Sequence, residues 1–173
     1  MRVYVPATLA MLQGLVADGV LHATNGTAFA VTPTLREAYA HGDEEELAEV
    51  ALREAALASL RLLGSDEPRG RRAEGPAALP TRRAVLVADV EDVTPRPDLD
   101  DAVVRLSAPV RLDDVICAHV DNAGAEPAVL AAIDAIDDAD LGDEDAELVV
   151  GDAQDHDLAW YAPQELPFLL ELL

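Results

Sequence analysis

The chain has 173 residues, which suits one ordinary domain. Its 34 acidic residues outnumber the 12 basic ones, all arginine, and the net charge of −22 opposes contact with nucleic-acid phosphates and anionic membrane surfaces. No stretch has the roughly 20 uncharged apolar residues of a membrane helix, residues 1–20 lack a signal-peptide pattern, and the single cysteine, Cys117, has no disulfide partner in the chain. We therefore expect a cytoplasmic protein with neither nucleic acid nor membrane as a partner.

The N-terminal part predicts short strands alternating with helices. Residues 1–5 alternate as a strand, and Thr8 is a good N-cap for a helix that ends near Gly19. Residues 27–32 predict a second strand. Thr34, which has a glutamate three residues later, is expected to cap a short helix.

The longest predicted helix begins after Asp43 and runs to about Leu63. Three glutamates fill its first turn, where the helix dipole favours carboxylates. Its apolar residues form two stripes, so we expect a wide buried face that is covered on two sides. The stripes consist of Leu47, Val50, Ala51 and Ala58, and of Leu52, Ala56, Leu60 and Leu63.

Residues 64–80 predict a flexible loop or linker, because they are rich in glycine, proline and charge and have no hydrophobic period. Five of the twelve arginines gather around this segment, at Arg69, Arg71, Arg72, Arg82 and Arg83. Two roles for residues 69–83 stay open. The segment either folds back onto the acidic surface of its own domain or docks a partner or a phosphate group.

The C-terminal half is expected to be rich in strands. Three are predicted at residues 84–90, 102–107 and 115–121, the first as a central strand because it is almost continuously apolar. A helix over residues 125–137 and a hairpin of residues 146–150 with 157–161 should follow. A short closing helix is expected to bury Phe168, Leu169 and Leu172.

Together these elements predict a single α+β domain over residues 1–173. We expect a two-layer sandwich in which helices pack on a mixed sheet of about six or seven strands. The order of strand, helix, two strands and helix from Val115 onward is partly ferredoxin-like.

The sequence lacks the common catalytic motifs. It has no glycine-rich phosphate loop, no G-x-S-x-G turn and no H-E-x-x-H helix, and its three serines lie outside any nucleophile pattern. No catalytic residue, no cofactor-binding residue and no cofactor is predicted from these motifs.

One group of residues could bind a divalent metal. His119 and Asp121 alternate with Cys117 along a predicted strand, so the three side chains share one face. If the strand that follows His156 is its neighbour, His119, Asp121 and His156 could form a metal or acid–base site. The alternative is that Cys117 is a small buried apolar residue and that the nearby Asp and His occur by chance among 20 aspartates.

Trp160 and Tyr161 also have two interpretations. Exposed aromatic residues often anchor interfaces. The chain has only six aromatic residues, however, so we expect this pair to fill space in the core.

Three stretches of the chain resemble an uncharacterised family, a domain of unknown function found in short acidic proteins of actinobacteria. They are MRVYVPATL, AVTPTLREAYAHGDEEELAEVALREAALASLRLL and DHDLAWYAPQEL, and the resemblance spans most of the chain outside residues 64–80. It implies a cytoplasmic actinobacterial protein. It carries no catalytic or binding residue to this chain.

Three functions follow from these observations. The first is a non-enzymatic acidic module that binds a protein partner or a small ligand, with a homodimer through an exposed strand edge as one form of it. The second is a small metal-dependent enzyme that uses His119, Asp121 and His156. The third is an acidic mimic of nucleic acid that occupies a basic groove.

Overall fold

A computed structural model describes residues 1–70 and 79–173. Its strands are β1 (Arg2–Ala7), β2 (Val20–Leu21), β3 (Thr27–Phe29), β4 (Ala84–Asp89), β5 (Val93–Pro95), β6 (Val103–Leu106), β7 (Val110–Arg111), β8 (Val115–Asp121) and β9 (Leu158–Tyr161). Its α-helices are α1 (Leu9–Asp18), α2 (Pro33–Ala38), α3 (Glu44–Gly70), α4 (Glu126–Asp140), α5 (Glu144–Gln154) and α6 (Leu166–Glu171).

The main sheet has seven strands in the order β5-β6-β3-β1-β4-β8-β9, and β2 and β7 form a separate pair. The α+β class and the strand number are as predicted. Every described pair is antiparallel, so the prediction of a mixed sheet is wrong. The long apolar runs did not reveal strand direction, because any strand covered on both faces has them.

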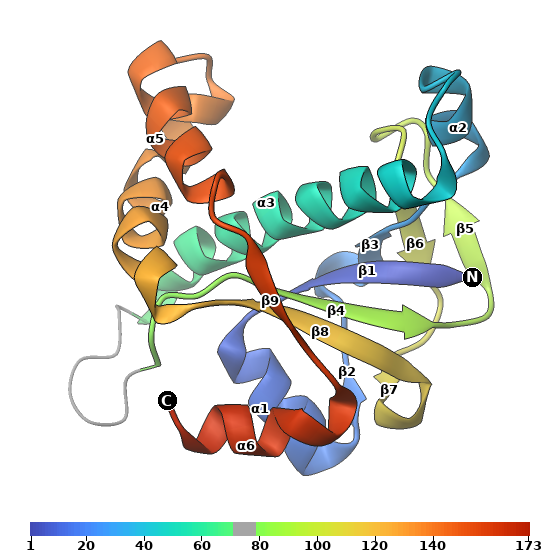
Figure 1. Cartoon of the computed structure of the whole chain (residues 1–173), viewed down its shortest axis with the longest axis horizontal. Helices are drawn as coiled ribbons and strands as arrows, with labels where there is room; N and C mark the ends of the chain where they lie inside the picture. Colours follow the sequence, from blue (N-terminus) through green and yellow to red (C-terminus); the bar gives the residue numbers. More distant parts are fainter. Residues whose placement is uncertain (71–78) are drawn as a thin grey trace.

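Helices cover both faces of this sheet, which makes three layers instead of the predicted two. α1 and α6 pack on one face, while α2 and α3 pack on the other (Figure 1). In β1, Val3 and Val5 accordingly face the α1 side, and Tyr4 faces the α3 side. The hairpin of α4 and α5 packs against the C-terminal part of α3, where Leu60 is fully buried.

The predicted caps of the long helices are confirmed. The hydroxyl of Thr8 accepts a hydrogen bond from the backbone N–H of Met11, and the carboxylate of Asp43 accepts one from Glu46. α3 continues to Gly70, however, so its last turns replace the start of the predicted loop. Residues 71–78 of that predicted loop lie outside the described residues.

Two other local predictions are wrong. α2 is capped by Thr32 and not by Thr34, since the Thr32 hydroxyl accepts from the Leu35 N–H. Residues 146–150 lie in α5 and not in a hairpin strand, because Asp143 caps this helix and three acidic side chains occupy its first turn. The predicted ferredoxin-like unit from Val115 is therefore not formed, and β9 pairs with β8 instead.

The closing helix, α6, buries a different set of residues from the one predicted. Leu166 and Leu169 are buried against the α1 side of the sheet, whereas Phe168 and Leu172 are exposed. Among the described residues, no helix has both the length and the apolar character needed to span a membrane.

Candidate functional site

A cleft of about 370 Å³ opens between α3 and the β8–β9 side of the sheet. Glu49 and Arg53 reach it from α3, and they share a helix face because they are four residues apart. The sheet contributes His119, and the segment that joins α5 to β9 contributes His156 and Asp157. Cavities of this size hold small molecules.

The pairing of β8 with β9 brings the predicted metal residues to this region. His119 lies opposite Trp160 and Asp121 lies opposite Leu158, so the assumed strand adjacency is correct. His119 and His156 both line the cleft. Asp121 does not line the cleft, because its carboxylate is bound to another side chain.

That partner is Arg83, in a buried ion pair. The guanidinium Nε and Nη2 of Arg83 each lie 2.8 Å from a different carboxylate oxygen of Asp121, and the backbone N–H of Arg83 donates to the same carboxylate. Nη2 also donates to the backbone carbonyl of His156. Both side chains are almost fully inaccessible, at 2% and 0% exposure. The pair therefore fastens the end of β8 to the segment before β9.

In the sequence, Arg83 belongs to the group of arginines around the predicted loop. The sequence does not show that its side chain is buried in an ion pair. Arg82, its neighbour, also bonds within the domain, through an ion pair with Glu126 on α4. Both residues are thus structural rather than free to dock a partner. Arg71 and Arg72 lie outside the described residues.

Cys117 and His119 lie side by side beneath α3. The Cys117 Sγ is 3.7 Å from the His119 Nε2. Burial raises the pKa of the thiol, against smaller opposing effects of a hydrogen bond from Trp160 and the charge of Arg2. Burial also lowers the pKa of His119, with Glu49 acting in the opposite direction. At neutral pH the pair therefore consists of a protonated thiol and a neutral imidazole. Cys117 is thus not in the thiolate form that reacts as a nucleophile.

The residues predicted for a metal do not form a ligand set. Among the described residues, no group of three or more His, Cys, Asp or Glu side chains is placed to hold a metal ion. Asp121, the predicted third ligand beside His119 and His156, is bound to Arg83 instead.

We expect Zn²⁺ or Mn²⁺ to leave the melting temperature of the protein unchanged, because no three of the described His, Cys, Asp and Glu side chains are placed to hold a metal ion. Thermal unfolding with and without each metal measures this, and His119→Ala with His156→Ala is the matched variant. Metal-dependent stabilisation of several degrees that disappears in the double variant would restore the metal hypothesis.

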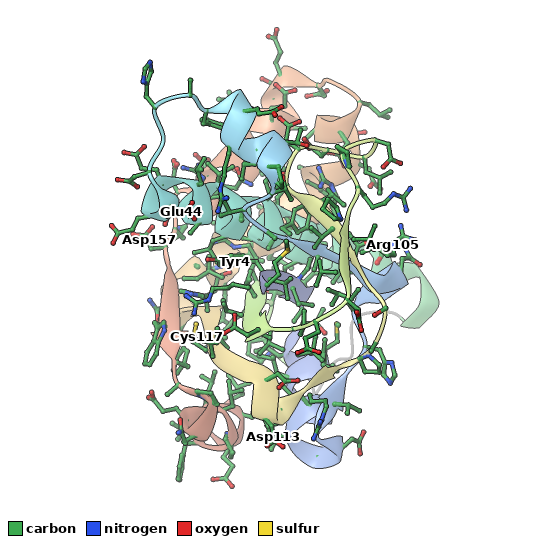
Figure 2. The ribbon with its side chains drawn as sticks, turned by 90° about the vertical axis from the view of Figure 1, so that its right-hand side faces the viewer. Tyr4, Glu44, Arg105, Asp113, Cys117 and Asp157 are labelled. Atoms are coloured by element: carbon green, nitrogen blue, oxygen red, sulfur yellow. The ribbon has the colours of Figure 1, made fainter. Side chains whose placement is uncertain are left out.

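Arg53 differs from most of the arginines whose side chains the structure describes, because it forms no ion pair with another described residue. Of the nine arginines whose side chains the structure describes, seven form ion pairs: Arg2, Arg36, Arg61, Arg82, Arg83, Arg96 and Arg111. Arg53 and Arg105 form none with the described residues. Figure 2 shows Arg105 on the opposite side of the molecule from Asp157, which borders the cleft.

A second hollow, of about 670 Å³, lies at the N-terminal end of α3. Its two arginines are already neutralised, Arg2 by Asp89 and Arg36 by Glu44. The smaller cleft is therefore the better candidate for a binding site, because it alone of the two has an arginine without an ion pair among its described lining residues.

Glu49 and Arg53 were not predicted as site residues, although their helical spacing places them near apolar residues of the buried face. They follow the spacing of the stripe that contains Leu52 and Ala56, which also line the cleft. The periodicity places them beside that stripe, but it does not show that a histidine lies opposite.

Comparisons with known proteins identify a family for this chain but assign no role to the cleft residues. No curated protein and no solved structure matches the chain. A family model matches residues 1–170, which is nearly the whole of the fold described above. The chain belongs to that family, the Family of unknown function (DUF6912).

Proposed function

We propose that this protein is a non-enzymatic cytoplasmic binding module that takes up a small ligand bearing a carboxylate or phosphate group. The observation that carries this proposal is Arg53 at the cleft, which forms no ion pair with the other described residues. In a chain with 34 acidic residues, most described arginines have a carboxylate partner, and Arg53 lies where a ligand could supply one.

The groups around Arg53 define what the ligand can be. A guanidinium presents a planar fork of donors that matches carboxylate and phosphate oxygens. The neutral imidazole of His119 and the amide of Gln154 add hydrogen-bonding groups. Glu49 and Asp157 repel a second anionic group and favour hydroxyl or ammonium groups. A small polar molecule with one anionic end fits this lining.

A non-enzymatic role is supported by the state of the potential nucleophiles. The Ser59 hydroxyl is fully buried, where it donates to the Ala7 carbonyl at 2.7 Å and accepts from the Ala84 N–H at 3.0 Å. It therefore joins α3 to the ends of β1 and β4. The thiol of Cys117 is protonated because burial raises its pKa. A reducing cytoplasm suits this single free thiol.

The test is an NMR titration of the protein with inorganic phosphate and with acetate, which has a single carboxylate. We expect saturable shifts of the His119 and His156 resonances and of amides around the cleft. Arg53→Gln should weaken the binding by about 10-fold to 100-fold, because it removes charge-assisted hydrogen bonds worth about 1.5–3 kcal/mol.

Arg105→Gln is the matched control, since Arg105 also lacks an ionic partner among the described residues but lies on the other side of the molecule. This variant should bind within about twofold of the wild type. Equal affinity of the Arg53→Gln variant and the wild type, or shifts that centre away from the cleft, would refute the proposal.

A further inference from the structure

The two edges of the main sheet differ in how they are protected. The β5 edge ends in Pro95, and Pro97 follows it, so this edge is blocked by residues that cannot donate a backbone hydrogen bond. β9 has no proline between Leu158 and Tyr161, and no strand of the described residues pairs with its outer side. Its outer backbone groups are therefore available to an added strand.

The exposed side chain on this edge is that of Trp160. Its side chain lies on the α3 side of β9, opposite His119, and acts as a hydrogen-bond donor toward the Cys117 thiol. The residue is nevertheless 58% exposed, so the prediction of a core role is wrong for Trp160, whereas Tyr161 is half-buried and packs against the core on the α1 side. A large aromatic group that is held in place and exposed beside an open strand edge is typical of an interface anchor.

The surroundings of β9 indicate the charge of its partner. From Leu112 to the C-terminus the sequence has 17 Asp and Glu residues and no arginine or lysine. All of β8, β9 and the helices α4, α5 and α6 come from this segment. Figure 1 shows α5 leading into one end of β9 and α6 following its other end. An approaching strand therefore meets the acidic α5 at one end of the edge and Glu165, just before α6, at the other.

We infer that the outer edge of β9 binds an extended, positively charged segment of a partner protein, which pairs with β9 as an eighth strand. Backbone hydrogen bonds hold the segment, and an apolar side chain packs on Trp160. Arginine or lysine side chains of the segment face the surrounding carboxylates. A second copy of this chain is the poorer occupant, because pairing β9 with itself would bring together two segments in which most carboxylates have no arginine partner among the described residues.

The experiment uses the full-length protein and a short, capped peptide of alternating arginine and valine. Because Trp160 is the only tryptophan, its fluorescence reports directly on this edge. At about 0.15 M salt, we expect a saturable blue shift and slowed amide exchange at residues 158–161. A peptide of equal charge with proline in place of valine should bind at least about 10-fold more weakly, since it cannot form a strand.

Trp160→Ala should weaken peptide binding by about 30-fold in calorimetry, and Trp160→Phe should restore most of it. Phe168→Ala is the matched control, because Phe168 is an exposed aromatic residue on α6, outside β9, and its replacement should have an effect of about twofold or less. The Arg53→Gln variant should bind the peptide normally, which separates this inference from the small-ligand proposal.

Three results would overturn the inference. One is equal affinity for the two peptides, which would indicate diffuse attraction to an acidic surface. The second is protection from exchange spread over α4 and α5 instead of β9. The third is a dimer in analytical ultracentrifugation that Trp160→Ala converts to monomer, because a second copy would then occupy the edge.

Discussion

Replacing Asp121 with alanine is expected to lower the free energy of unfolding by about 3–5 kcal/mol. The substitution leaves the Arg83 guanidinium buried, at 2% exposure, with its opposing charge removed. It also takes the acceptor from the backbone N–H of Arg83. Urea unfolding followed by circular dichroism measures the change, and the thermal midpoint should fall with it.

The matched control for this prediction is Asp140→Ala. Asp140 accepts two hydrogen bonds from Arg61, at 3.1 and 2.9 Å, in the same two-pronged arrangement. The two side chains are 44% and 45% exposed, so water screens their attraction. Its loss should cost about 1 kcal/mol or less. Equal effects of the two substitutions would contradict the importance of burial for the Asp121 pair.

The double replacement Arg83→Met with Asp121→Leu separates two explanations of the expected loss. If the cost comes from an orphaned buried charge, the double variant should recover part of the stability that Asp121→Ala loses. The recovery should be incomplete, because Arg83 also donates to the His156 carbonyl and Asp121 accepts from a backbone N–H. A double variant less stable than Asp121→Ala would show that the pair itself is strongly stabilising.

The second large effect is expected at Leu60. This side chain is fully buried between α3 and the α4–α5 hairpin, in contact with a cluster that includes Ile133 and Val150. Leu60→Asp buries a carboxyl group without a partner and should destabilise the protein by at least about 4 kcal/mol, which approaches the whole stability of an ordinary domain. If this variant does not accumulate in folded form, Leu60→Ala should still show a loss of about 2–5 kcal/mol.

Leu148→Asp is the control for the same substitution in a helix. Leu148 lies within α5 and is exposed, so its replacement loses little burial and should cost about 1 kcal/mol or less, mainly through helix propensity and nearby acidic residues. Urea denaturation of the variants provides the comparison. A Leu60→Asp variant as stable as Leu148→Asp would show that the hairpin does not pack on α3 as described.

The parts of the fold that were predicted correctly depend on short-range interactions. An N-cap such as Asp43 bonds a backbone N–H three residues ahead, and a helical stripe repeats within a few residues, so both can be recognised without knowing the tertiary structure. The same local rule explains the error at residues 146–150. Their apolar residues fit a strand, but the cap at Asp143 and the acidic first turn favour a helix.

The candidate site could be predicted only in part. Alternation along β8 correctly placed Cys117 and His119 on one face, and the pairing of β8 with β9 was a correct assumption. The partner of Asp121 could not be deduced, because Arg83 is 38 residues away along the chain and belonged to an arginine-rich segment. The cleft itself could not be predicted, because the sequence does not show which face of α3 lies against the sheet.

The sequence alone determined the charge of this protein, its α+β class and the start of its long helices, because these depend on composition and on contacts between residues close in the chain. Tertiary structure decided the strand order, the burial of the Arg83–Asp121 pair, the position of Arg53 at the cleft and the exposure of Trp160. Each of these depends on which distant segments pack together. Packing is decided by the burial of the whole set of apolar faces at once, and no single stretch of residues contains that information.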